Sequence, residues 1–271
     1  MAEPKPTKGL ILKKTLALSD LHLGRKHSRL KKAKDLKPLL EGFEQIMLLG
    51  DILDLWYLTK TNAQELEGQL RETCREAGAK KVQWFRGNHD ASIEDACEFV
   101  LDHHVMYFHG HAIFSKLLGE GNIEARIQIL NKKHYGDHRH GSRHGKSSWT
   151  WVEKAYASIP QRMLTPLMWN PILKRRLLLM AHEVGGIEAK IRGLPDHKPM
   201  LPGGPVRAAV FGHSHCPGVR KFKGLTVFNL GGWVSNTRAC GFIQEGRQGR
   251  LVMIENLRHP HWGKVLHEAH I

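Results

Sequence analysis

Cysteine is scarce in this chain, which has four cysteines among its 271 residues. They stand at Cys74, Cys97, Cys216 and Cys240, and no two of them form a C-x-x-C pair. This spacing matches neither a zinc ribbon nor the disulfide framework of a small secreted domain. Because unpaired cysteines are typical of reducing compartments, the sequence predicts a cytoplasmic location.

Long apolar runs are also missing. No stretch of about 18 or more apolar residues occurs, so the sequence predicts no transmembrane helix. The N-terminal segment MAEPKPTKGLILKKTLALSD has neither the long apolar core nor the small-residue cleavage site of a signal peptide. We therefore expect neither a membrane span nor a secretion signal.

Negative charge is in short supply as well. The chain has 26 acidic against 41 basic residues, for a formal net charge of +15. Such a balance favours partners that carry phosphate, namely nucleic acid, nucleotides or an anionic lipid surface. A basic surface that contacts only water is the alternative. The hydrophobic fraction of 41% excludes a chain that is disordered throughout.

Short apolar runs alternate with helical patterns in the first part of the chain. The spacing of Leu66, Leu70 and Cys74 predicts an amphipathic helix that ends near Gly78, and a second helix is predicted over 92–104. This alternation predicts an α/β fold with a mixed sheet, and two sheets packed face to face are compatible with it. The predicted strands lie within 15–20, 45–55, 81–90, 104–111, 206–215, 224–234 and 249–257.

The domain organisation follows from the segment that has no strand pattern. We expect one domain over residues 10–260, interrupted by a mostly helical insertion at 115–201, and a C-terminal tail at 261–271. The insertion mixes basic residues with Leu, Met and Trp. That mixture is compatible with a groove for acyl chains and an edge that contacts a membrane, or with ordinary helix packing.

Five polar clusters each follow an apolar run. Residues just past the carboxyl ends of strands line the ligand crevice of open α/β sheets, so five such ends indicate one shared site. Aspartate, asparagine and histidine suit Mn, Fe, Zn and Co, and the absence of thiolate ligands argues against a structural zinc site. In extended backbone, residues i and i+2 project to the same side, as the D-x-H and H-x-H spacings require. The candidate metal ligands are Asp20, His22, Asp51, Asn88, His109, His213 and His215.

The order of the five clusters resembles the calcineurin-like metallophosphoesterase superfamily: D-x-H, G-D, G-N-H-D, H-G-H and G-H-x-H. The resemblance implies a four-layer α-β-β-α sandwich that hydrolyses phosphoesters or pyrophosphates with two divalent ions. Manganese is the expected metal, with Fe, Zn or Co as alternatives. Asp51 would bridge the ions. One ion would be held by Asp20, His22 and His215, and the other by Asn88, His109 and His213.

Residues beside these ligands have predicted roles in the reaction. Two close cations can polarise a phosphoryl oxygen and activate a water molecule as hydroxide. We expect His89 to stabilise the transition state or to protonate the leaving oxygen, and Asp90 to orient His89. A helix N-cap is the alternative for Asp90. His111 would contact substrate or orient a ligand, or simply be a solvated histidine.

Within the superfamily, the chain resembles the UDP-2,3-diacylglucosamine pyrophosphatase group of lipid A biosynthesis. The resemblance rests on the opening SDLHLG, the helical insertion and the late segment FNLGGWV. It implies a lipid-linked nucleotide as substrate and peripheral contact with the inner membrane. Arg25 and Arg86 are candidate phosphate contacts, although either could be a plain surface charge.

Two other functions stay open at this stage. A phosphodiesterase or nuclease acting on cyclic nucleotides or nucleic acid fits the basic charge equally well. A non-catalytic scaffold on the same fold is the third hypothesis, although such scaffolds typically lose ligands or the catalytic histidine.

Overall fold

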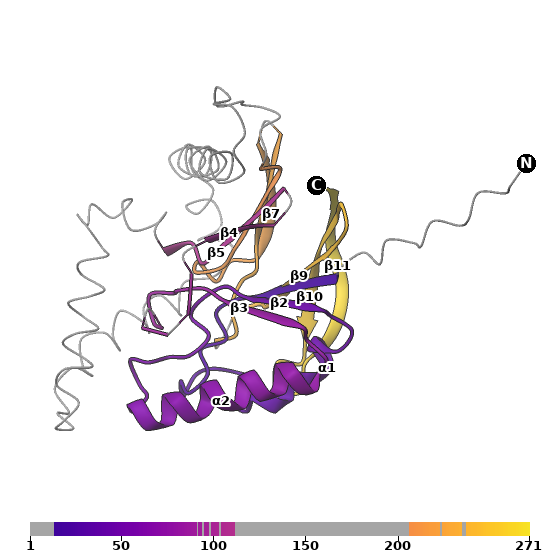
Figure 1. Cartoon of the computed structure of the whole chain (residues 1–271). Coiled ribbons are helices and arrows are strands. Elements are labelled where there is room, and N and C mark those ends of the chain that lie inside the picture. The colour runs from indigo at the N-terminus through magenta and orange to yellow at the C-terminus, as the bar shows by residue number, and fades with distance from the viewer. Residues whose placement is uncertain are drawn as a thin grey trace, which may run out of the picture.

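The computed structural model describes residues 14–90, 92–93, 95–97, 99–102, 104–111, 206–222, 224–234 and 237–271. Within these ranges the chain forms two mixed β-sheets and a small group of helices (Figure 1). No helix in the described ranges combines the length and the apolar character that a membrane span requires. The predicted insertion at 115–201 lies outside the described residues.

The larger sheet has six strands in the order β11-β10-β9-β1-β2-β3. Strands β1, β2 and β3 are parallel, and β9, β10 and β11 continue the sheet from β1 with antiparallel pairing. The six strands are β1 (Lys14–Leu18), β2 (Gln45–Leu48), β3 (Lys81–Trp84), β9 (Cys240–Glu245), β10 (Gln248–Glu255) and β11 (His261–His270).

The smaller sheet has five strands in the order β4-β5-β6-β8-β7. Strands β5, β6 and β8 are parallel, while β4 and β7 pair antiparallel at the two edges. The five strands are β4 (Phe99–Asp102), β5 (Val105–Phe108), β6 (Ala208–Phe211), β7 (Gly218–Phe222) and β8 (Leu225–Asn229).

Three helices, η1 (Ala33–Leu36), α1 (Lys37–Leu40) and α2 (Lys60–Glu76), belong to the described part of the chain. Figure 1 shows α1 and α2 on one side of the larger sheet and the smaller sheet on its other side. The Thr59 side chain caps α2 by accepting a hydrogen bond from the Asn62 backbone N–H. Beyond the helix, Gly78 has a φ of +89°, which ends the helix close to the predicted position.

Strands β1 and β2 of the larger sheet bury both of their faces, because apolar side chains point alternately to two cores. In β1, Leu16 and Leu18 pack with the helices, while Ala17 packs with residues of the smaller sheet. Strands buried on both faces are continuous apolar runs, and this made β1 and β2 recognisable in the sequence. The predicted α/β sandwich of two facing sheets is confirmed. An outer helical layer over the smaller sheet would fall on residues outside the described ranges.

The helix predicted over 92–104 is wrong. Residues 99–102 form β4, which pairs antiparallel with β5 from Val100 opposite Tyr107 to Asp102 opposite Val105. Upstream, Cys97 forms a parallel bridge with Phe85. Pairing with neighbouring strands therefore decides the structure here, and the spacing of apolar residues along the sequence is a poor guide to it.

The C-terminal tail predicted at 261–271 is also wrong, since residues 261–270 form the ten-residue edge strand β11. The segment mixes polar and apolar residues and shows no strand pattern in the sequence. An exposed edge strand can have this composition, because it does not need an apolar residue at every second position. Trp262 anchors it by packing on Phe43, with ring centroids 6.1 Å apart. The terminal Ile271 is buried against the inter-sheet core.

Candidate metal centre

The five polar clusters follow the carboxyl ends of β1, β2, β3, β5 and β6, as predicted. These strands belong to both sheets, so the centre is built at the end of the sandwich where the carboxyl ends of these five strands come together. Backbone hydrogen bonds join the loops: Asp20 N donates to Gly50 O at 3.1 Å, and His22 N donates to Asp51 O at 2.9 Å. The clusters that follow β1 and β2 are thereby fixed against one another.

The backbone of the centre is unusually strained. Among the described residues other than glycine, seven have a positive φ, and five of these are predicted metal ligands. Residues with side chains adopt this region rarely, and such strain is found at functional sites. The five are Asp20, His22, Asp51, His213 and His215.

Two glycines allow the loops to approach the aspartates. A Cβ atom on Gly212 would lie 2.0 Å from Asp20 Oδ2, and one on Gly87 would lie 2.2 Å from Asp51 Oδ1. Neither position has room for any larger residue.

Asp51 lies at the middle of the centre and is buried. Its Oδ1 accepts a hydrogen bond from His89 N at 2.8 Å. Its Oδ2 faces His109 Nε2 at 3.4 Å and His22 Nε2 at 3.8 Å. Burial alone would raise the pKa of Asp51, but the surrounding imidazoles hold it well below the usual value, so the carboxylate is ionised.

Asp20 is arranged in the same way. Its Oδ2 accepts a hydrogen bond from His213 N at 2.8 Å, and its Oδ1 faces His215 Nε2 at 3.1 Å. Burial alone would raise the pKa of Asp20, but the hydrogen bond and charge of His215, together with the charge of His109, hold it below its usual value. Each of the two aspartates therefore uses one oxygen to hold a loop and presents the other to histidine.

The ligand atoms form groups that could each hold a cation. Within every group, one atom from each residue lies within 4.8 Å of the others. Two of the groups share Asp51, and the structure thereby brings together predicted ligands of both ions. The groups are Asp20, His22 and His215; His22, Asp51 and His89; and Asp51, His109 and His213. Asn88 joins the last of these, with Oδ1 3.3 Å from His109 Nε2.

The donor atoms fit divalent cations. His109 Nδ1 lies 2.8 Å from the Leu49 carbonyl and must donate to it, so Nε2 of the neutral ring carries a lone pair. That lone pair faces the oxygens of Asp51 and Asn88, an arrangement that calls for a positive charge between them. Burial alone would lower the pKa of His109, but Asp51 raises it to about 9. A bound metal ion would take the place of that proton.

The comparisons with known proteins agree with this geometry. The family described as Calcineurin-like phosphoesterase matches residues 13–217, which is most of the chain. The chain belongs to the calcineurin-like phosphoesterase family. No curated protein sequence matches it. The family and the clusters of aspartate and histidine together indicate a binuclear metal site in a metal-dependent hydrolase.

Solved structures of calcineurin-like and related proteins align over nearly the whole chain, at low similarity. Vps29 from Chaetomium thermophilum is 12% identical, covering 97% of this chain and 99% of that one, with a TM-score of 0.44. A predicted phosphoesterase from Streptococcus pneumoniae is 9% identical, covering 96% and 98%, with a TM-score of 0.41. A dimetal phosphatase from Danio rerio is 10% identical, covering 89% and 96%, with a TM-score of 0.44. Similarity at this level carries no functional conclusion.

Asp54 is a residue of the phosphoesterase centre that the sequence interpretation missed. This fully buried carboxylate lies with Oδ2 3.1 Å from His22 Nδ1 and Oδ1 3.0 Å from His89 Nδ1. Since a carboxylate only accepts, both rings donate from Nδ1 and turn Nε2 toward the centre. The signal was available, because Asp54 follows the predicted ligand Asp51 by three residues.

His89 is held between Asp54 and an indole ring. Trp56 stacks on the imidazole with ring centroids 3.8 Å apart and an interplanar angle of 27°. Burial alone would lower the pKa of His89, but the charges of Asp51 and Asp54 raise it to about 9. The imidazole is therefore positively charged at neutral pH and can donate a proton.

The prediction that Asp90 orients His89 is wrong. Asp90 Oδ1 accepts from Gly87 N at 2.8 Å and Asp51 N at 3.0 Å, and Oδ2 accepts from Ile52 N at 2.7 Å. The alternative of a helix N-cap also fails, because the hydrogen bonds go to two strand-end loops. Burial raises the pKa of Asp90 to about 7. Asp90 therefore joins the loops after β2 and β3, and the orienting role belongs to Asp54.

The three predicted substrate contacts occupy different surroundings. Arg25 Nη1 lies 3.5 Å from Asp54 Oδ2, next to the centre. The His111 ring lies 5.4 Å from the His109 ring, and burial, with a smaller effect of His109, lowers its pKa to about 4. Arg86 is exposed in the loop that carries Asn88. Contact with substrate stays a prediction for all three.

Proposed function

We propose that this protein hydrolyses a phosphate ester or pyrophosphate bond with the help of two divalent cations. The observation that carries the proposal is the buried Asp51, which forms one ligand group with His109 and His213 and lies 3.8 Å from His22 Nε2 of the group Asp20, His22 and His215. Asp20, His22 and His215 would hold one cation with Asp51. Asn88, His109 and His213 would hold the other with Asp51. When bound, the cations supply Lewis acidity toward a phosphoryl oxygen and a more acidic water.

The side chains contribute orientation and a proton. Asp54 fixes His22 and His89 with Nε2 toward the centre, so that the first can bind metal and the second faces the substrate. Protonated His89 would donate its Nε2 proton to the leaving oxygen or stabilise negative charge in the transition state. In the metal-free chain, Asp51 and Asp54 raise the pKa of His89 to about 9; with cations on Asp51, Asp54 would be the carboxylate that still favours the protonated ring.

A nucleotide-linked pyrophosphate such as UDP-2,3-diacylglucosamine is the substrate we favour. Two segments that carry the resemblance, SDLHLG and GGWV, lie against one another: Trp233 N donates to Asp20 O at 3.0 Å. A Cβ atom on Gly232 would lie 2.9 Å from the His215 ring, so this segment contacts the centre directly. Binding of acyl chains or of an anionic membrane would fall to the insertion, outside the described residues.

A phosphodiesterase or nuclease is the second candidate, because the net charge of +15 suits a nucleic acid as well as a lipid-linked nucleotide. Both candidates use the same metal chemistry. Substrate preference is therefore the property that separates them.

The test is turnover by the full chain loaded with Mn²⁺. UDP-2,3-diacylglucosamine, single-stranded DNA, a cyclic nucleotide and an aryl phosphodiester would be compared at equal concentration. Release of UMP from the first supports the favoured substrate, while turnover of DNA or the cyclic nucleotide alone supports the second candidate. Asp51→Asn and His89→Ala should remove activity, and Asp95→Asn, an exposed position outside the centre, should not. No turnover of any substrate would favour a non-catalytic scaffold.

A further inference from the structure

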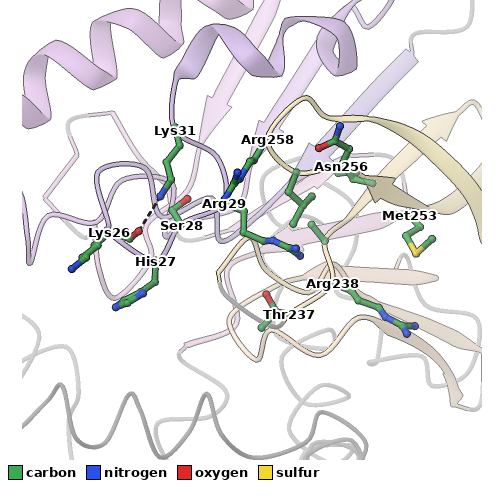
Figure 2. A pocket seen from close by; sticks show the side chains of 13 residues that line it. Lys26, His27, Ser28, Arg29, Lys31, Thr237, Arg238, Met253, Asn256 and Arg258 are labelled. Carbon is green, nitrogen blue, oxygen red and sulfur yellow. Dashed lines mark hydrogen bonds between the residues drawn. The ribbon is translucent and has the colours of Figure 1, made fainter.

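A second polar pocket lies apart from the metal centre (Figure 2). It has a volume of about 460 Å³ and opens between three segments, residues 26–31, 237–239 and 253–258. Neither His89 nor any of the seven predicted metal ligands lines it. No residue that the proposed hydrolysis assigns a role lines this pocket.

The lining of this pocket is strongly basic. No aspartate or glutamate lines it, and among the described residues no carboxylate pairs with any of its cationic side chains. Lys31 instead donates from Nζ to the Lys26 carbonyl at 2.9 Å, as Figure 2 shows. Side chains of like charge that line one pocket repel one another, so an anion between them would be stabilised. The five cationic residues are Lys26, Arg29, Lys31, Arg238 and Arg258.

The backbone around the pocket is fixed before any ligand binds. Arg29 N donates to Trp233 O at 2.7 Å, which joins the first segment to the stretch that leads into the second. Ile254 N donates to Ala239 O at 2.9 Å and joins the second segment to the third. The buried residues Ala239, Ile254 and Leu257 add an apolar lining. A preformed pocket with an apolar lining and cationic side chains has the character of a small-molecule site.

We propose that this pocket binds a small molecule with two or more linked phosphate groups and an apolar organic part, such as a nucleoside diphosphate. Three arginines can each form paired hydrogen bonds with phosphate oxygens, which lysine cannot match. The apolar lining provides contact area for the organic part. The volume falls in the range of small-ligand pockets, roughly 300–1,000 Å³. The proposal stands independently of the hydrolytic function.

Isothermal titration calorimetry on the full chain in EDTA tests this proposal, with UDP and inorganic phosphate as the two probes. The EDTA keeps metal ions from binding UDP at the centre. The triple variant R29A/R238A/R258A removes the three arginines. The control triple K34A/K81A/R247A removes three exposed charges outside the pocket.

The expected result is that UDP binds to the unchanged chain more tightly than inorganic phosphate. The pocket triple should weaken UDP binding by at least about tenfold, since hydrogen bonds to charged groups are each worth about that much. The control triple should change it by less than about threefold, a loss of long-range attraction only. The proposal is overturned if UDP does not bind, if both triples weaken binding equally, or if inorganic phosphate binds as tightly as UDP. If R29A/R238A/R258A has a lower melting temperature than the unchanged chain, R29K/R238K/R258K is used in its place. It keeps the charge and should still weaken UDP binding, because lysine cannot form the paired hydrogen bonds of arginine.

Discussion

The pairing of Asp54 with His89 sets the protonation of the centre. A carboxylate 3.0 Å from an imidazole stabilises the charged ring, and in the metal-free chain Asp51 and Asp54 together raise the pKa of His89 to about 9. An acid catalyst is active only while it is protonated. The rate should therefore fall as the pH rises through the pKa of His89.

Replacing Asp54 by asparagine should lower that pKa. We expect Asp54→Asn to move the basic limb of the pH–rate profile toward lower pH by about one unit or more, because an opposite charge is lost. The turnover number should fall by about a hundredfold, the usual contribution of a positioned acid. Histidine NMR of the metal-free variant measures the pKa directly. Asp95→Asn is the control. An unchanged basic limb of the pH–rate profile in Asp54→Asn would rule out that Asp54 sets the pKa of His89.

The metal-free protein should lose stability as the pH rises from about 6.5 to about 9. Both His89 and His109 have pKa values raised from 6.5 to about 9 in the folded chain, with Asp51 as the leading favourable charge. A group whose pKa is raised in the folded state stabilises the fold at pH values below its unfolded pKa. This stabilisation is lost as the pH rises through its folded pKa. Melting temperatures in EDTA at pH 6.5 and pH 9 measure this loss. Asp51→Asn should flatten the dependence, and a rise in Tm over this window would contradict it.

At the scale of elements, the loop after β6 is placed by its glycine. A methyl group on Gly212 would lie 2.0 Å from the Asp20 carboxylate, so Gly212→Ala must shift either the loop or a predicted ligand. We expect metal affinity to fall by at least tenfold, with a loss of stability of about 1–3 kcal/mol from overpacking. Mn²⁺ titration and thermal melting measure the two effects. Wild-type affinity in Gly212→Ala would show that the close approach is dispensable.

Gly68 provides the opposite case in helix α2. It is exposed, and a Cβ atom there would meet nothing within 4 Å. Gly68→Ala should therefore raise stability by about 0.5–1 kcal/mol, because alanine loses less backbone entropy in a helix. Urea denaturation measures the change, and activity should stay at the wild-type value. A lower urea midpoint would contradict the open space that the structure shows around Gly68.

Strand prediction succeeded where burial was complete and failed at edges. The buried strands β1 and β2 contain the apolar runs 16–18 and 46–48, and polar residues follow each run, so the sequence marks where both strands end. The edge strand β4 is mostly apolar (FVLD), and β11 mixes polar and apolar residues without strict alternation, so their pairing partners decide their structure. Short edge strands such as β7, with sequence GVRKF, give no alternating pattern to detect.

At the scale of the whole molecule, the order of polar clusters predicted the centre because each cluster ends a strand. Chain order does not say which polar atoms touch, so Asp54 was missed and Asp90 was given its role. The three-dimensional packing of β1, β2 and β3 decides that question. The pocket between residues 26–31, 237–239 and 253–258 joins segments remote in the chain, and no motif marks it.

The most direct measurement is anomalous diffraction from crystals of the full chain soaked in Mn²⁺. We expect two manganese peaks about 3.5–4 Å apart, on either side of Asp51 Oδ2, the spacing of two-metal hydrolases. One peak should contact Asp20, His22 and His215, and the other should contact Asn88, His109 and His213. A single peak, or peaks away from Asp51, would contradict a binuclear centre at the carboxyl ends of strands from both sheets.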